Sequence, residues 1–149
     1  MLMIPSGVKR TRFLKKRNIY GALGNNVMIQ SRKIPLYPEL IYVGDNVRIA
    51  SDVKFITHDV IHNVLNNLPA EQRNGHKFVE KCGKIEIGDN VFIGAGTILT
   101  YDTKIGSNVV IGTGSVVVKD IPDDSVCAGV PCKRIGSFQD FLKKRMKGC

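Results

Sequence analysis

An aliphatic side chain recurs at every sixth position through the middle of the chain. Divided into sixes from Ile87, the sequence reads IGDNVF, IGAGTI, LTYDTK, IGSNVV and IGTGSV, and the next group begins at Val117. Glycine takes the second place in four of these groups, and a small or β-branched residue takes the fifth place. The frame also occurs upstream, from Val43 as VGDNVR, IASDVK and FITHDV, and more weakly from Leu23 as LGNNVM and IQSRKI.

A period of six fits neither an amphipathic helix nor a long alternating strand. It predicts a triangular coil with three short strands per turn of about eighteen residues, in which the aliphatic side chains point inward. Ile87 is then expected to stack on Ile105, and Ile93 on Ile111. Glycine is expected to relax the backbone at the corners, where Asn and Asp tolerate left-handed backbone angles. About four turns, roughly 4.8 Å apart, would form a short prism.

Two interruptions break the repeat. Residues 33–42 hold two residues more than the frame allows, and two prolines, so a bulge or short external turn is expected there. Residues 61–84 leave the frame altogether and predict a loop extruded from the coil; loops this long are usually functional.

The chain is therefore expected to be a single domain with a basic arm over 1–20, coils over 23–60 and 85–122, the extruded loop over 61–84 and a C-terminal segment over 123–149. In that last segment, Ser137 and Asp140 predict the start of a short helix through 147. Its apolar stripe, which includes Phe138, Phe141 and Leu142, is expected to pack on the prism or on a neighbouring subunit.

The composition, 43% hydrophobic and 23% charged over 149 residues, is that of one ordinary soluble domain. No run approaches the ~20 apolar residues of a membrane span, and no signal peptide is recognisable, so a cytoplasmic location is expected. The net charge of +9 calls for an anionic partner. Nucleic acid is not expected, because recognition motifs and aromatic–basic stacking surfaces are missing. A phosphate-rich ligand fits, as does peripheral association with the inner face of a membrane through six basic residues between 9 and 18.

These repeats resemble the hexapeptide-repeat acyltransferases, whose fold is an all-β, left-handed parallel β-helix. The resemblance covers Leu23 to Ile135. The stretch IGTGSVVVKDIPDDSVCAGVPCKRI is similar to the end of galactoside- and maltose-type acetyltransferases and of capsule or O-antigen O-acetyltransferases. Serine acetyltransferases are less similar, because their helical N-terminal domain and histidine-containing coil motif are missing. The resemblance implies acetyl-CoA as donor and a homotrimer whose active sites are shared between subunits.

Acyl transfer from a thioester to a hydroxyl or amine needs a base, and histidine suits this role because its pKa lies near neutral pH. His58 stands in FITHDVIH, where the coil passes into the extruded loop. This position is similar to that of the family's catalytic histidine, and the string THD recurs in the capsule enzymes. Asp59 or a backbone carbonyl is expected to fix the tautomer of the imidazole. His62 and His76 receive no role.

Positions that match the family's contacts with CoA are Ala95, Thr113, Val118 and Lys119. Lys133 stands where an arginine is usual, and Arg134 is a further candidate for binding phosphate. Lysine keeps the charge there but lacks the bidentate fork of arginine.

The sequence leaves the identity of the acceptor open. A sugar of a surface polysaccharide is the first expectation, and an antibiotic or other small hydroxyl compound is the second. A γ-carbonic-anhydrase-like zinc hydratase is a third possibility, and a catalytically idle scaffold a fourth. His58, His62, His76 and Cys82 could be taken for a zinc cluster, but two of the histidines lie in the irregular loop and the spacing differs, so no metal is expected. The spacing of the four cysteines predicts reduced thiols.

Overall fold

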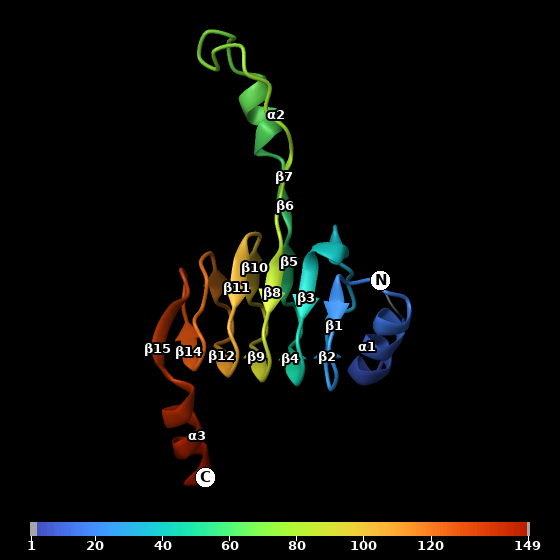
Figure 1. Ribbon diagram of the computed structural model, residues 1–149, viewed down its shortest axis with the longest axis vertical. Coiled ribbons are helices and arrows are strands. Elements are labelled where there is room, and N and C mark those ends of the chain that lie inside the picture. The colour runs from blue at the N-terminus through green and yellow to red at the C-terminus, as the bar shows by residue number, and fades with distance from the viewer. Residues whose placement is uncertain (1–2, 149) are drawn as a thin grey trace.

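The computed structural model describes residues 3–148. Its centre is a triangular prism of short parallel strands (Figure 1). The first face holds β1 (Ala22–Leu23), β3 (Ile41–Val43), β8 (Ile85–Ile87) and β11 (Thr103–Ile105). The second face holds β2 (Met28–Ile29), β4 (Val47–Ile49), β9 (Val91–Ile93), β12 (Val109–Ile111) and β14 (Ser125–Ala128). The third face holds β5 (Lys54–Ile56), β10 (Ile98–Thr100) and β13 (Val116–Val117).

The inward stacking predicted from the period of six is confirmed. Ile105 lies opposite Ile87 and Ile111 opposite Ile93 in parallel register. Ile93 and Ile111 have no exposed surface, and Ile105 and Ile87 are also buried. Each aliphatic residue of the frame thus contributes to one continuous column of core side chains along the prism axis.

The glycines of the repeat have a different role from the one expected. Gly88, Gly94, Gly106 and Gly112 are absent from the residues with positive φ; the left-handed positions come two residues later in each group, for example at Asn90 with φ 57° and at Gly96 with φ 71°. A Cβ placed on Gly94 would lie 2.5 Å from the backbone nitrogen of Thr113 on the next coil. Glycine is therefore required because adjacent coils approach closely. The expectation that the glycine after each aliphatic residue relaxes the backbone is wrong, while the expectation that Asn and Asp take left-handed angles at the corners is confirmed.

The coil is irregular at both ends. In the first turn, Ala22 pairs with Tyr42, twenty residues away, as the two additional residues predicted. The excursion contains a short 3-10 helix, η1 (Pro38–Leu40), and Tyr37 before it has a left-handed backbone. In the last turn, Val109 pairs with Ser125, only sixteen residues away. The coil thus extends beyond residue 122, where it was expected to end, and β15 (Lys133–Ser137) follows as an antiparallel neighbour of β14.

The extruded segment forms an arm that reaches away from the prism (Figure 1). Its base is an antiparallel pair, β6 (His58–Asp59) and β7 (Lys81–Cys82), in which His58 lies opposite Cys82. The short helix α2 (Ile61–Asn66) follows β6. The arm therefore begins three residues earlier than the frame predicted, because His58 and Asp59 pair with the returning strand.

The basic segment near the N-terminus is not a free arm. Residues Gly7–Lys16 form helix α1, which packs against β2 of the first coil. Arg10 is 2% exposed, and its guanidinium donates to the carbonyl oxygens of Ile4, Ile29 and Gln30. Leu14 is also buried. The six basic residues are thus not equivalent, because Arg10 lies inside the molecule.

Helix α3 (Phe138–Met146) ends the described chain, and the predicted cap is confirmed by a 3.0 Å hydrogen bond from the Asp140 amide to the Ser137 hydroxyl. No residue of α3 is buried, and Figure 1 shows it extending away from the strands. Phe138 and Phe141 of its apolar stripe are nevertheless half-buried, and the helix contacts β15 and the last strand of the second face, β14. None of the helices within residues 3–148 combines the length and apolar character needed to cross a bilayer.

Candidate active site

His58 lies where the third face passes into the arm. Strand β5 ends at Ile56, and the buried Thr57 donates a 2.6 Å hydrogen bond from its hydroxyl to the carbonyl oxygen of Leu36. His58 follows as the first residue of β6 and is half-buried. Its Nδ1 is buried and has no hydrogen-bond partner within residues 3–148.

Asp59 does not orient the imidazole as expected. Its Oδ2 accepts a 2.5 Å hydrogen bond from the Tyr101 hydroxyl, and its Oδ1 accepts a 3.0 Å bond from the Ile61 amide. The Tyr101 hydroxyl is the main reason that the pKa of Asp59 lies below its usual value. The carboxylate therefore holds the base of the arm against the prism and is not engaged by His58.

The proposed CoA residues fall on the two edges of the third face. Ala95 and Thr113 lie one coil apart between the second and third faces, where the Gly114 amide donates a 2.9 Å bond to the Ala95 carbonyl. Val118 and Lys119 follow β13 at the opposite edge. Thr113, Val118 and Lys119 are exposed, and Ala95 is half-buried. The structure thus brings each pair together but separates the two pairs by the width of the face.

His58 and Lys119 leave the third face at the same edge. Leu99 of β10 pairs with both Phe55 and Val117, so β5 and β13 are aligned with one strand between them. His58 comes three residues after Phe55, and Lys119 two residues after Val117. Two strand spacings separate β5 from β13, about 10 Å.

Lys133 and Arg134 lie on β15 beyond the last coil. Lys133 pairs with Ala128, and its side chain is exposed. The Arg134 guanidinium already donates from Nε to the Ser125 hydroxyl at 3.2 Å and from Nη2 to the Asp124 carbonyl at 3.3 Å. Lys133 is therefore the freer of the two cations for a phosphate.

The histidines and cysteines do not converge on a metal site. Between residues 3 and 148, no group of three or more His, Cys, Asp or Glu side chains is placed to hold a metal ion. His76 packs edge-on against Phe78, 4.7 Å away between ring centres. Cys82, Cys127 and Cys132 are free thiols, and burial raises the pKa of Cys127 to about 11. Cys149 lies outside the described residues.

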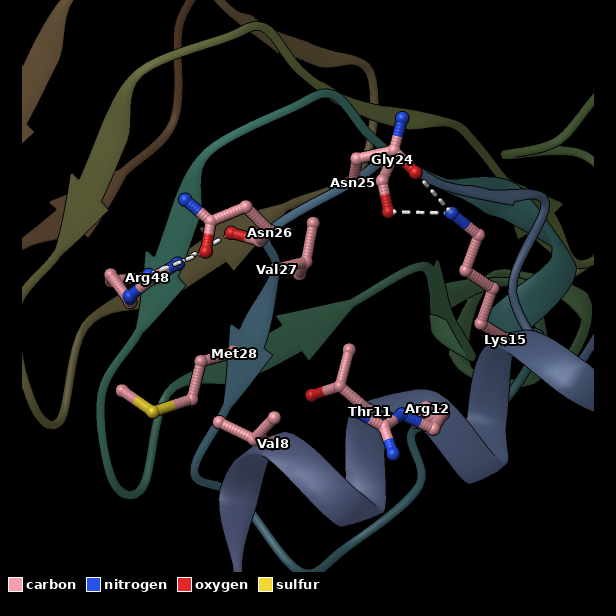
Figure 2. A pocket seen from close by; sticks show the side chains of 10 residues that line it. All are labelled: Val8, Thr11, Arg12, Lys15, Gly24, Asn25, Asn26, Val27, Met28 and Arg48. Atoms are coloured by element: carbon pink, nitrogen blue, oxygen red, sulfur yellow. Dashed lines mark hydrogen bonds between the residues drawn. The ribbon is translucent and has the colours of Figure 1, made fainter.

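A hollow of about 260 Å³ lies between α1 and the first coil (Figure 2). Three cations line it: Arg12, Lys15 and Arg48. Lys15 donates to the Gly24 carbonyl and the Asn25 side chain, and Arg48 donates to Asn26. None of the lining residues is acidic, so this hollow is positively charged.

A parallel coil of six-residue units with a histidine at the root of an extruded arm defines a class of repeat transferases. Residues 84–119 match the model of a family described as bacterial transferase hexapeptide (six repeats). The chain belongs to this hexapeptide-repeat transferase family, and the predicted all-β, left-handed parallel β-helix is confirmed.

Three relatives illustrate the similarity. Protein CapG of Staphylococcus aureus is 45% identical over 107 residues, which are 72% of this chain and 58% of CapG, so the match spans little more than half of that relative. A maltose O-acetyltransferase from Clostridium difficile 630 is 34% identical with a TM-score of 0.64, over 92% of this chain and 78% of that one. A galactoside acetyltransferase in complex with coenzyme A is 30% identical with a TM-score of 0.66, over 93% and 75%.

Proposed function

We propose that this chain transfers an acetyl group from acetyl-CoA to a hydroxyl or amine of a sugar, with His58 as the general base. The observation that carries the proposal is the common edge of His58 and Lys119. It would place a proton acceptor and a cation for CoA phosphates along one groove, about 10 Å apart at the backbone. The names of the relatives, which include a galactoside and a maltose acetyltransferase, support the reaction class.

In this reaction the imidazole of His58 takes the proton of the acceptor hydroxyl while the oxygen attacks the thioester carbonyl. The carbon–sulfur bond then breaks, and the proton passes from the imidazolium to the leaving thiolate. General-base catalysis of this kind contributes roughly 10²- to 10⁴-fold. Lys119 and Lys133 would meet the phosphates of CoA, with Arg134 as a weaker contributor because two of its donors are already engaged.

The proposed functional unit is a homotrimer with active sites between subunits. Ala95 and Thr113 lie at one edge of the third face and Lys119 at the other, so a single extended CoA cannot follow both edges of one chain. Two subunits side by side would bring the His58 and Lys119 edge of one chain opposite the Ala95 and Thr113 edge of the next.

Exposed apolar side chains on several elements support the same assembly. Phe92 on the second face is 45% exposed and Val118 beside the third face 48%. On the arm, Val64 and Val79 are 67% and 79% exposed. A closed threefold assembly would bury such surfaces.

We further propose that the acceptor belongs to a surface polysaccharide and that the enzyme acts in the cytoplasm, near the inner face of the membrane. On α1 and its C-terminal cap, the cations available to an anionic surface are the exposed ones: Lys9, Arg12, Lys15, Lys16 and Arg17. Arg10, one of the six basic residues expected to take part, is buried against the coil instead. The charged hollow of Figure 2 lies on the same side of the molecule as α1 and is lined by residues of α1, β2 and β4.

Thiol release from acetyl-CoA tests the proposed reaction. The full chain would be incubated with acetyl-CoA and a panel of free sugars, nucleotide sugars, amino sugars and aminoglycosides. We expect at least one sugar to give thiol release faster than the rate measured without an acceptor. Release only with an aminoglycoside would overturn the sugar assignment, and no release with any acceptor would contradict the transferase proposal.

A further inference from the structure

The two additional residues of the first coil bring a tyrosine against His58. The rings of Tyr37 and His58 are 5.2 Å apart between centres and meet at 87°, edge to face. Aromatic pairs favour this geometry because the positive edge of one ring meets the negative face of the other. In a regular eighteen-residue turn this excursion would be shorter, so the irregularity in the repeat and the contact with His58 coincide.

Tyr37 is held there at a cost. Its backbone angles of φ 50° and ψ 52° are left-handed, a conformation that bulky side chains rarely adopt. Such strain persists where the surroundings impose it, and it clusters at functional sites. Pro38 and the rest of η1 follow directly, and the Leu40 amide donates back to the Tyr37 carbonyl at 3.0 Å.

The same excursion contacts both strands at the base of the arm. On the outgoing side, the carbonyl oxygen of Leu36 accepts a hydrogen bond from the hydroxyl of Thr57, the residue before His58. On the returning side, the Tyr37 hydroxyl donates a 3.0 Å bond to Oε2 of Glu80, next to β7. This bond raises the pKa of Tyr37. Tyr37 therefore connects the first coil to His58 of β6 and to Glu80 beside β7.

We propose that Tyr37 is a positioning residue that sets the plane of the His58 imidazole, and that Glu80 anchors Tyr37 through its hydroxyl. A catalytic histidine is usually oriented by a hydrogen bond at its second ring nitrogen. Here Nδ1 has no such partner within residues 3–148, and Asp59 is engaged by Tyr101 and Ile61. Packing by Tyr37 replaces the hydrogen bond. This inference rests on the proposed role of His58 as general base.

Graded variants of the full chain separate the two contacts. Tyr37→Leu removes both the ring and the hydroxyl, whereas Tyr37→Phe keeps the ring and removes only the bond to Glu80. Tyr42→Leu, on the outer side of the first face, is the matched control. Glu80→Gln retains an oxygen that can accept the Tyr37 hydroxyl, and Glu80→Ala does not. Each variant would be assayed by thiol release and by the ¹H–¹³C ring signals of His58, assigned with His58→Gln.

A misoriented base slows the chemical step. Tyr37→Leu should therefore reduce kcat by roughly 10- to 100-fold and leave the KM for acetyl-CoA unchanged. The His58 ring signals should shift in the same variant, because the ring current of Tyr37 is lost. The kcat values of Tyr37→Phe and Glu80→Ala should lie between those of Tyr37→Leu and the parent. Glu80→Gln should keep most of the parent's kcat. Tyr42→Leu should match the parent.

Unchanged kcat and unchanged His58 signals in Tyr37→Leu would overturn the inference. A raised KM for the acceptor with normal kcat would also overturn it, because Tyr37 would then contact the acceptor instead. If Tyr37→Leu does not fold, Tyr37→Phe and the Glu80 pair decide the question with the same two readouts. Failure of the general-base proposal is distinguishable, since His58→Ala would then keep its activity whatever Tyr37 does.

Discussion

The Tyr101 hydroxyl and the Asp59 carboxylate, 42 residues apart in sequence, form a 2.5 Å hydrogen bond at the root of the arm. Lys81, on the returning strand, lies 4.9 Å from the centre of the Tyr101 ring and forms a 3.4 Å ion pair with Asp102. The arm is thus fixed to the third coil on one side and, through Tyr37, to the first coil on the other. His58 lies between these two attachments.

The pH dependence of the Tyr101–Asp59 bond follows from two opposite pKa shifts. The pKa of Asp59 is lowered from 3.8, so its contribution to stability is present above that value and is lost as the pH falls through the lower folded pKa. The pKa of Tyr101 is raised from 10.0, so the bond is kept below that value and lost as the pH rises through the higher folded pKa.

Tyr101→Phe should therefore lower the midpoint of thermal unfolding at neutral pH, and this difference from the parent should shrink in strong acid. In the same variant the pKa of Asp59, followed by NMR, should rise towards its ordinary value. A constant difference in midpoint from neutral pH to well below the ordinary pKa of Asp59 would contradict this account.

His58→Ala should lower kcat by roughly 10²- to 10⁴-fold, because the acceptor hydroxyl loses its base, while the affinity for CoA hardly changes. His62→Ala is the matched control, since His62 lies four residues further on, in α2, and should retain activity. Steady-state thiol release and a CoA titration measure the two quantities. Near-normal kcat in His58→Ala would remove this residue from the mechanism.

Ile93→Ala should destabilise the protein by about 2–5 kcal/mol, because the side chain is fully buried in the core column. Ile93→Val, which removes one methylene, should cost only about 0.5–1.5 kcal/mol. Denaturant unfolding at fixed protein concentration gives both values. Equal losses for the two variants would mean that the column is not packed as described.

The trimer proposal predicts that activity and assembly are lost together. Sedimentation of the parent chain should give a single species of three times the monomer mass. Phe92→Glu, which puts a charge on the exposed second face, tests the contribution of that face to assembly and should weaken association if the face is covered. A stable monomer with full activity would rule out active sites shared between subunits.

Removing single cations should separate CoA binding from surface docking. Lys119→Ala or Lys133→Ala should raise the KM for acetyl-CoA several-fold, whereas joint neutralisation of Lys9, Lys16 and Arg17, on α1 and its C-terminal cap, should leave it unchanged. The α1 variant should instead lose co-sedimentation with anionic liposomes, since each basic residue near the lipid contributes about 1 kcal/mol. Equal recovery of the parent chain in the supernatant with anionic and neutral liposomes would eliminate the membrane role.

The sequence by itself determined the prism and its frame. A period of six can be counted along the chain, so the inward positions of Ile93 and Ile111, the two additional residues before Tyr42 and, to within three residues, the departure of the arm all follow from local order. His58 was selected as the candidate base from its place at the end of the coil frame together with its resemblance to the family's catalytic histidine. The short last turn was missed, because Val126 and Cys127 continue the second face after a shift of frame that only pairing with β12 reveals.

Only the tertiary structure decided which side chains meet across coils. The need for glycine at Gly94 comes from the backbone of the next turn, and the burial of Arg10 comes from three carbonyl groups at the open end of the first coil. Asp59 is adjacent to His58 in sequence, yet it bonds to Tyr101, while Tyr37 reaches the imidazole from 21 residues upstream. These contacts depend on how the turns stack, since stacking sets the neighbours of each side chain and the period alone sets only its face.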